Sequence, residues 1–282
     1  MSGPILALRG VTKSYPQGGL LDRLLGRASN FVALDDVTLQ IARGDVVGIV
    51  GESGSGKSTL ASLAVGLTRP TTGEILLDGE PLAALMRDHA GPWRRRIQMV
   101  FQDSGSALNP RKTIARCLAQ TLALRGVPRA TREDESMALL ALVGLGSEMA
   151  PRLPHELSGG QRQRVGLARA LAMKPDILIA DEPVSSLDVS LQAQVINLLS
   201  RLTRELGLTL LFISHDLAVV RTLCTRIIVM RKGRIVEEGP CLDVLARPAH
   251  PYTQLLISSV PKGIAGRRAP AAAAASATSS VG

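Results

Sequence analysis

The sequence predicts an α/β fold in which helices cover both faces of a mostly parallel sheet. Short apolar segments such as "DILIA" and "LTLLFIS" alternate with segments of helical spacing, which is typical of parallel sheets. A glycine-rich loop, "GESGSGKS", stands between an apolar strand and a helix. The chain has 282 residues, of which 45% are hydrophobic, and this is enough for a full core.

The chain up to Glu80 is predicted to form mainly strands. "ILALRGVTKSY" and "VALDDVTLQI" alternate apolar and polar residues, as strands with one buried face do. The segment between them, "PQGGLLDRLLGRASN", is rich in glycine and predicts a surface loop. A buried strand, "DVVGIV", leads into the glycine-rich loop and a helix, and "RPTTGEILLDGEPL" returns to strands and turns.

From Lys112 to Gly146 the spacing becomes helical, with a break at Val127 and Pro128, which predicts a helical insert. The α/β pattern resumes with the helix "GQRQRVGLARALAM", which ends before Pro175. A later amphipathic helix is predicted to have one apolar face made of Leu191, Val195, Leu198, Leu199, Leu202 and Leu206. Two apolar strands follow, and "RKGRIVEEG" predicts a hairpin. The alanine-rich tail, residues 263–282, is predicted to be disordered.

The net charge and the cysteines indicate which partners and which cellular compartment are compatible with the sequence. The net charge of +9 fits an arginine-rich solvated surface, a nucleic-acid partner or the anionic inner face of a membrane, and charge alone does not choose. Cys117, Cys224 and Cys241 form no C-x-x-C pair, so we expect buried thiols in a reducing cytosol. We expect no secretory signal, and no apolar run approaches the roughly 18 residues of a membrane span.

The glycine-rich loop matches the phosphate-binding pattern G-x-x-x-x-G-K-[ST] in full, with the strand and helix that this P-loop requires. Glycines let backbone N–H groups converge on phosphate oxygens at a helix N-terminus. The lysine supplies charge near the β- and γ-phosphates, the serine hydroxyl suits Mg²⁺, and the following threonine can bond the α-phosphate. The predicted nucleotide-binding residues are Gly51, Glu52, Ser53, Gly54, Ser55, Gly56, Lys57, Ser58 and Thr59.

A second motif, "ILIADE", is an apolar strand that ends in two carboxylates. Asp181 can hold Mg²⁺ through water, and Glu182 can act as general base on an attacking water. Small kinases, GTPases and DNA motors share these two motifs. The N-K-x-D motif with which a GTPase reads its base is absent from the sequence.

Three further motifs, "LSGGQ", "SSLD" and "SHD", bring a resemblance to the ATP-binding-cassette (ABC) ATPases. The order is that of the family: P-loop, glutamine loop, signature, Walker B strand, D-loop and histidine switch. The resemblance covers the chain from Leu6 to Pro261. It implies a P-loop NTPase (RecA-like) core with an antiparallel β-subdomain and an inserted α-helical subdomain. The ATPase domain would span residues 1–262, with the helical and signature subdomain at about 103–165.

The resemblance also implies roles for single residues. Tyr15 matches the aromatic residue that stacks on adenine, Gln102 the glutamine that touches Mg²⁺, and His215 the histidine that contacts the γ-phosphate and orients Glu182. Alone, they would be interpreted as a strand tyrosine, a strand-end amide and a structural histidine. The implied magnesium ligands are Ser58, Gln102 and Asp181.

In this family two cassettes pack head to tail, and each ATP lies between the P-loop of one chain and the signature of the other. The resemblance therefore implies that the signature, Ser158, Gly159, Gly160 and Gln161, faces a γ-phosphate held by a partner, with Asp188 at the same interface. The γ-phosphate would stabilise the closed dimer, and hydrolysis would remove it.

Local features narrow the resemblance to the peptide/nickel (oligopeptide/dipeptide) importer ATPases of bacteria, F-type. These are "GLLDRLLGR", "SALNPRKTI" and "RPAHPYTQLL"; within the last, "HPYTQLL" is the most specific, because no structural requirement for it is evident. The implied assembly is two ATPases, identical or different, with two permeases and a solute-binding protein at the cytoplasmic face of the inner membrane. ATP and Mg²⁺ are the implied cofactors. No cysteine follows Cys241, so we expect no iron–sulfur cluster, unlike in some members.

Two alternatives stay open from the sequence. A soluble cassette ATPase could act on nucleic acid or ribosomes, but the tandem cassettes, long coiled coil or zinc cysteines usual there are absent from the sequence, so no nucleic-acid partner is expected. A cassette could also bind ATP without hydrolysing it, against which the intact Glu182, His215 and signature argue. The cargo is open among peptides, nickel, glutathione and sugars, with di- or oligopeptides favoured.

Replacing Ser158 with arginine tests whether the signature serves a partner's nucleotide. Ser158→Arg is expected to spare nucleotide binding by the isolated chain and to block ATP turnover in the assembled complex. Binding of a fluorescent nucleotide and release of phosphate would measure the two effects. Loss of binding in the isolated chain would show instead that the signature serves its own nucleotide.

Overall fold

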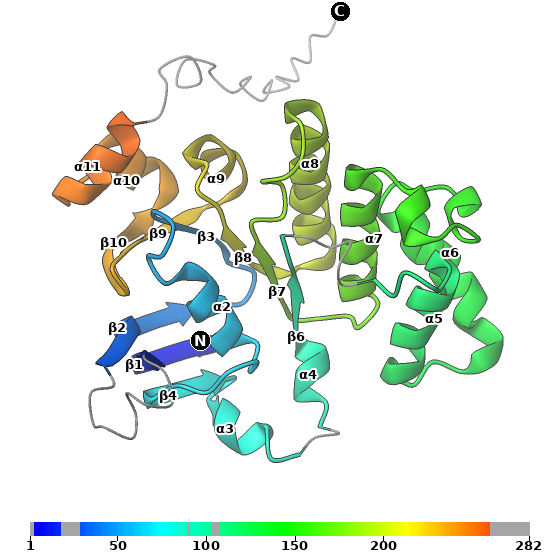
Figure 1. Ribbon diagram of the computed structural model, residues 1–282, viewed down its shortest axis with the longest axis horizontal. Coiled ribbons are helices and arrows are strands. Elements are labelled where there is room, and N and C mark those ends of the chain that lie inside the picture. Colours follow the sequence, from blue (N-terminus) through cyan, green and yellow to red (C-terminus); the bar gives the residue numbers. More distant parts are fainter. Residues whose placement is uncertain (1–2, 18–28, 89–90, 103–107, 260–282) are drawn as a thin grey trace, which may run out of the picture.

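The computed structural model describes residues 3–17, 29–88, 91–102 and 108–259. The predicted loop at "GLLDRLLGR", the start of the predicted helical subdomain and the predicted disordered tail lie outside these residues. Two sheets with helices between and around them form the described part of the chain, shown in Figure 1. The predicted α/β fold, with a parallel core sheet and an antiparallel sheet, is confirmed.

The core sheet has six strands, and five of them are parallel. Its order is β10 (Arg234–Pro240), β9 (Arg226–Arg231), β3 (Val46–Val50), β8 (Thr209–Ile213), β7 (Ile177–Asp181) and β6 (Ile97–Val100). Strand β10 is antiparallel to the others, and it forms the predicted hairpin with β9. Strand β8 is buried at every position, which is why its sequence is a continuous apolar run.

Alternate residues of the core strands enter two separate hydrophobic cores. Ile177 and Ile179 of β7 face the core that contains helix α2 (Lys57–Ala64) and the antiparallel sheet. Leu178 and Ala180 face the core beneath helices α7 (Gly159–Leu171), α8 (Val189–Leu206) and α9 (Leu217–Leu223). Helix α2 therefore lies between the two sheets, and the larger helices cover the opposite face (Figure 1).

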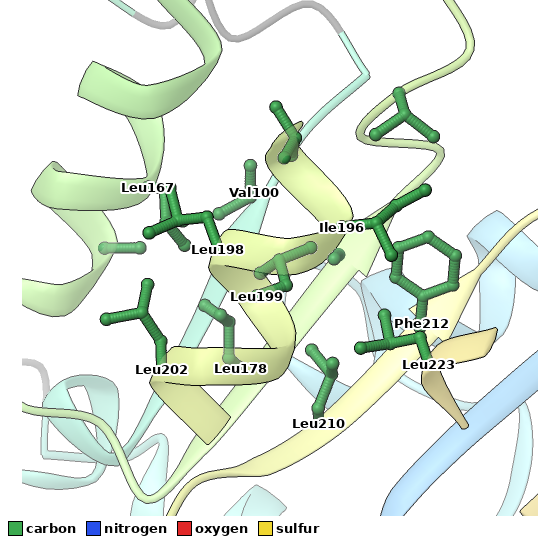
Figure 2. Packing of buried hydrophobic residues seen from close by; sticks show 14 of the residues in the cluster. Val100, Leu167, Leu178, Ile196, Leu198, Leu199, Leu202, Leu210, Phe212 and Leu223 are labelled. Carbon is green, nitrogen blue, oxygen red and sulfur yellow. The ribbon is translucent and has the colours of Figure 1, made fainter. Parts of the chain in front are cut away.

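Figure 2 shows how α8 closes the second core. Leu198 points toward Leu167 of α7, Leu199 lies next to Leu178, and Ile196 points toward Phe212, all within one hydrophobic cluster. Two details differ from the sequence prediction: Leu206, the last residue of the helix, is 47% exposed, and Ile196 is buried although it was not assigned to the apolar face.

The antiparallel sheet has the order β2 (Ser29–Ile41), β1 (Leu6–Gln17), β4 (Thr72–Leu77) and β5 (Glu80–Pro81), followed by the short helices α3 (Leu82–Leu85) and α4 (Trp93–Arg96). Ion pairs join this sheet to the core. Asp78, after β4, accepts hydrogen bonds from Arg43 and, at 2.5 Å, from Arg96. Arg96 also donates to Asp176 at 2.6 Å. The side chains of this network are about a third to a half exposed, so it contributes little to the free energy of unfolding.

The helices between β6 and β7 include α5 (Ile114–Arg125), α6 (Arg132–Leu142), the 3₁₀ turns Arg129–Thr131, Ser147–Met149 and Pro154–Glu156, and α7. Helices α5 and α6 are those of the predicted insert, and α7 is the helix with which the α/β pattern was predicted to resume. Thr113 caps the start of α5, and Gly126, with φ of 93°, ends it at the predicted break. Helices α5, α6 and α7 pack against one another (Figure 1). The proposed subdomain boundaries stay predictions.

The C-terminal helices α10 (Cys241–Ala246) and α11 (Pro251–Ser258) follow β10 and lie beside the end of the core sheet (Figure 1). All three cysteines are buried and free, as predicted. Across the residues that the structure describes, no helix is both long and apolar enough to cross a membrane.

Candidate nucleotide-binding site

Parallel topology brings the predicted motifs to one edge of the core sheet. The P-loop begins directly after β3, Asp181 ends β7, and His215 and Gln102 each lie two residues beyond the ends of β8 and β6. These four strands are parallel, so their carboxyl ends meet at the same edge, where α/β sheets bind ligands.

The P-loop is too close to its neighbours for side chains at two of its glycines. A Cβ at Gly51 would lie 2.2 Å from the Met230 carbonyl oxygen, and one at Gly56 would lie 2.7 Å from the Ala33 carbonyl oxygen. Gly51, Gly54 and Gly56 have φ values of 151°, 79° and 107°, which other residues rarely adopt. Gly56 also forms the N-cap of α2, so the backbone enters the helix directly from the loop.

Lys57 turns back over the loop. Its side chain is only 6% exposed, and Nζ donates to the carbonyl oxygens of Gly51 at 2.7 Å and Glu52 at 2.8 Å. Burial lowers the pKa of Lys57, and the carboxylates of Glu182 and Asp181 oppose that shift. A buried cation thus lies among loop carbonyls and acidic strand ends, where it can meet a polyphosphate.

Ser58 and Asp181 come together across the loop, with 3.3 Å between the serine Oγ and the aspartate Oδ1. Burial raises the pKa of Asp181, and the hydrogen bond from Ser58 opposes the rise. A hydroxyl and a carboxylate are oxygen ligands of the kind that Mg²⁺ prefers, so this pair fits the predicted metal. Gln102, the third predicted ligand, is exposed beyond β6, and no hydrogen bond joins it to this pair within the described residues.

Glu182 and His215 form the second pair, with 3.4 Å between Oε2 and Nδ1. Glu182 has a φ of 46°, which turns the chain sharply at the end of β7. Its N–H donates to the Ile213 carbonyl oxygen at 3.0 Å, and this bond holds the turn against β8. The His215 imidazole is well exposed, while the Glu182 carboxylate is mostly covered. Solvent therefore reaches the carboxylate from the side on which His215 lies.

Tyr15 lies near the end of β1 and is 38% exposed. Its cross-strand partner is Phe31 of β2, and Lys13 Nζ lies 5.0 Å from the centre of the tyrosine ring. An exposed ring of this kind can stack on a flat base. The sequence pattern indicated Tyr15 but not Phe31 or Lys13, because strand pairing is what brings these residues beside it.

The signature residues and Asp188 have clear local roles. Ser158 caps α7: its Oγ accepts from the Gln161 N–H at 3.2 Å, and Gln161 Oε1 accepts from the Ser158 N–H at 2.9 Å. Gly159 and Gly160 lie against Leu187 and Leu191, where added Cβ atoms would meet them at 3.4 and 3.1 Å. Asp188 caps α8 by accepting from the Leu191 N–H at 2.9 Å. Facing a partner's nucleotide is compatible with these roles and stays a prediction.

Two contacts to the P-loop were not foreseen. The N–H of Gly233, in the hairpin turn, donates to the Ser55 carbonyl oxygen at 3.0 Å. The N–H of Glu52 donates to the Tyr252 hydroxyl at 2.9 Å. The only signal for the second contact was the "HPYTQLL" motif itself, for which the sequence offered no structural reason.

The fold and the site together define a P-loop nucleotide-binding cassette, and comparison with known proteins agrees. A family model described as ABC transporter matches residues 34–185. A second, described as the C-terminal region of oligopeptide/dipeptide transporters, matches residues 236–280. The chain belongs to the ABC transporter family, as one of its ATP-hydrolysing cassettes.

Relatives are similar over most of the chain. A putative peptide import ATP-binding protein of Brucella ovis is 48% identical over 92% of this chain and 79% of its own. A probable peptide ABC transporter ATP-binding protein of Sinorhizobium fredii is 46% identical over 93% of this chain and 74% of its own.

Solved structures show the same fold. A dimeric ATP-binding cassette in a post-hydrolysis state, bound to ADP and Pi, matches with a TM-score of 0.73 and 33% identity over 84% of this chain and 98% of its own. CbiO1 of Clostridium perfringens, part of an ABC transporter complex, matches with a TM-score of 0.74 and 28% identity over 87% and 92%.

Gly51→Ala tests the need for close approach in the P-loop. Because the new methyl would meet the Met230 carbonyl at 2.2 Å, the loop must shift. We expect nucleotide binding to fall at least about tenfold and the free energy of unfolding to fall by roughly 1–3 kcal/mol. Calorimetric titration and denaturant unfolding measure the two quantities.

Gly44→Ala is the matched control, since Gly44 also has a positive φ, of 77°, but an added Cβ would meet nothing within 4 Å. This variant should lose some stability and keep its nucleotide affinity. Normal affinity in Gly51→Ala would contradict the prediction.

Proposed function

We propose that this chain is the ATP-hydrolysing subunit of a bacterial importer whose cargo is di- or oligopeptides. The observation that carries the cargo class is the match of residues 236–280 to the C-terminal region of oligopeptide/dipeptide transporters. The relatives named as peptide import proteins, which cover most of the chain, support the same class.

In this proposal the P-loop holds the phosphates of ATP, and Tyr15 stacks on the adenine. Lys57 contributes its positive charge to the β- and γ-phosphates. Ser58 and Asp181, with Gln102, would hold the Mg²⁺ that neutralises developing charge on these phosphates. The 3.3 Å approach of Ser58 to Asp181 supports this assignment.

Glu182 is proposed to take the proton from the attacking water. His215 is proposed to orient Glu182 and this water. The 3.4 Å between the two side chains supports this division of roles. A carboxylate can serve as base here because an imidazole lies beside one of its oxygens, while among the described residues its other oxygen accepts no hydrogen bond.

The cassette is proposed to work in pairs. Ser158 and the glycines after it, at the N-terminus of α7, would face the γ-phosphate held by a second cassette, identical or different. The relative whose structure is a dimer bound to ADP and Pi supports this arrangement. Charge at the γ-phosphate would then close the pair, and hydrolysis would open it.

The permeases are proposed to dock on the helical insert, at the cytoplasmic face of the inner membrane. A cavity of about 480 Å³ lies beside α5, lined by Leu108, Asn109, Cys117, Gln120, Thr121 and Leu124, among others. Leu124 is 72% exposed there, which supports an apolar contact with a short permease helix.

The importer assignment is tested by recovering the chain from detergent-solubilised membranes and identifying the proteins that come with it. Two permeases are expected, and deleting the gene should abolish uptake of labelled di- or oligopeptides. Recovery without permeases, together with salt-dependent DNA binding by the pure chain, would overturn the proposal in favour of a nucleic-acid ATPase.

Replacing Glu182 tests the proposed base. Glu182→Gln should keep ATP binding and slow hydrolysis by about 10²–10⁴-fold, because the amide cannot accept the proton. An ATP-bound dimer should accumulate, which light scattering after gel filtration detects. Glu205→Gln, on the exposed side of α8, is the control and should turn over ATP normally. Full turnover by Glu182→Gln would remove Glu182 from this role.

A further inference from the structure

The C-terminal helix α11 reaches the P-loop, 200 residues away in sequence. Tyr252 is 4% exposed, and its hydroxyl oxygen accepts the N–H of Glu52 at 2.9 Å. We propose that Tyr252 is a positioning residue of the nucleotide site, which holds the start of the P-loop and, through it, Lys57. The proposal rests on the nucleotide-binding role of the P-loop and is independent of the cargo.

One peptide group joins Tyr252 to Lys57. The peptide between Gly51 and Glu52 accepts from Lys57 Nζ at its oxygen, at 2.7 Å, and donates to Tyr252 at its nitrogen. Hydrogen bonds on opposite ends of one peptide polarise each other and strengthen together. Lys57 also donates to the next carbonyl oxygen, that of Glu52, at 2.8 Å. The lysine and the tyrosine therefore fix the same turn of the loop from two sides.

Tyr252 is itself held firmly. The guanidinium of Arg231, at the end of β9, lies 4.8 Å from the centre of its ring. The Tyr252 N–H donates to His250 Nδ1 at 3.1 Å, which caps α11. Tyr252 is thus placed by the strand next to the P-loop strand and by the cap of its own helix.

Glu237 of β10 fixes the turn before the helix. Its carboxylate accepts the N–H of Ala249 at 2.8 Å and that of His250 at 3.0 Å. Each residue of "HPY" therefore has a structural role, since His250 caps the helix, Pro251 begins it and Tyr252 reaches the loop. These hydrogen bonds order the turn, so the Tyr252 hydroxyl is held at a defined position.

The hydroxyl remains neutral under ordinary conditions. Burial raises the pKa of Tyr252, and the hydrogen bond from the Glu52 N–H opposes the rise. The negative charge of the Glu52 carboxylate and its hydrogen bond with the hydroxyl add to the rise. Arg231 is the cation that faces the ring, and its charge also opposes the rise. The contact to the loop is therefore a neutral hydrogen bond that persists across the pH range of nucleotide-binding assays.

A loop that is already ordered loses less conformational freedom when a ligand binds, so its affinity is higher. Removing the hydroxyl leaves the Gly51–Glu52 peptide with the hydrogen bond from Lys57 at its oxygen and without the Tyr252 bond at its nitrogen. Tyr252→Phe should therefore weaken ATP and ADP binding by about three- to tenfold, the usual effect of one net hydrogen bond. The ring and its contact with Arg231 remain in this variant.

The test measures the Kd of a fluorescent ATP analogue for the full chain, and KM and kcat in the assembled complex. For Tyr252→Phe we expect Kd and KM to rise together, kcat at saturating ATP to stay within about twofold, and the melting temperature without nucleotide to change by less than about 2 °C. Leu255→Ala, at a 63% exposed position of the same helix, is the matched control and should change none of these.

Glu237→Gln loosens the turn by a separate route, since it leaves one acceptor oxygen where two N–H groups bind. It should raise Kd in the same direction while Tyr252 is intact. Wild-type Kd and KM in Tyr252→Phe would overturn the proposal, as would a lower melting temperature with unchanged affinity, because Tyr252 would then only pack the helix. If the wild-type chain binds nucleotide normally but its deletion leaves peptide uptake unchanged, the proposed importer function is wrong, and the proposed role of Tyr252 is unaffected.

Discussion

The close approach of the P-loop backbone to strands β2 and β9 is the constraint on which the rest of the site depends. Carbonyl oxygens of Met230 and Ala33 lie where side chains of Gly51 and Gly56 would be. The loop is therefore shaped by its neighbours, and the Gly233 N–H, bonded to the Ser55 carbonyl, continues the same contact. With the backbone fixed in this way, Lys57 can be buried and still turn toward the loop.

Three charged groups share the edge of the core sheet because parallel strands end there together. Lys57 is buried near the acidic end of β7, and its charge offsets those of Asp181 and Glu182. The positive φ of Glu182 is a local strain that the bond from its N–H to Ile213 sustains. Strained backbone of this kind is typical of functional sites, and nothing in the local sequence requires the turn. The strain therefore supports a functional role for the Glu182 carboxylate.

The C-terminal segment is joined to the P-loop by contacts between residues far apart in the chain. Its helix α11 is too short to be stable by itself, so its position depends on Glu237, Arg231 and the loop that it contacts. The part of the chain that resembles the C-terminal region of oligopeptide/dipeptide transporters is thereby also part of the nucleotide site. A substitution in that segment can therefore change the affinity for nucleotide through Tyr252 and the Gly51–Glu52 peptide group.

The fold class and the order of the motifs could be predicted without coordinates, because the alternation of strands and helices and the spacing of the motifs are visible along the chain. Strand β7 shows its two buried faces in its apolar run, and the P-loop shows its glycines at fixed spacing. Leu206 was misplaced because periodicity does not show where along a helix the buried face ends. The pairing of Phe31 with Tyr15 and the contact of Tyr252 with Glu52 became evident from the three-dimensional packing alone. Such contacts join segments far apart in the chain, and their geometry is set by how sheets and helices pack, which no local pattern encodes.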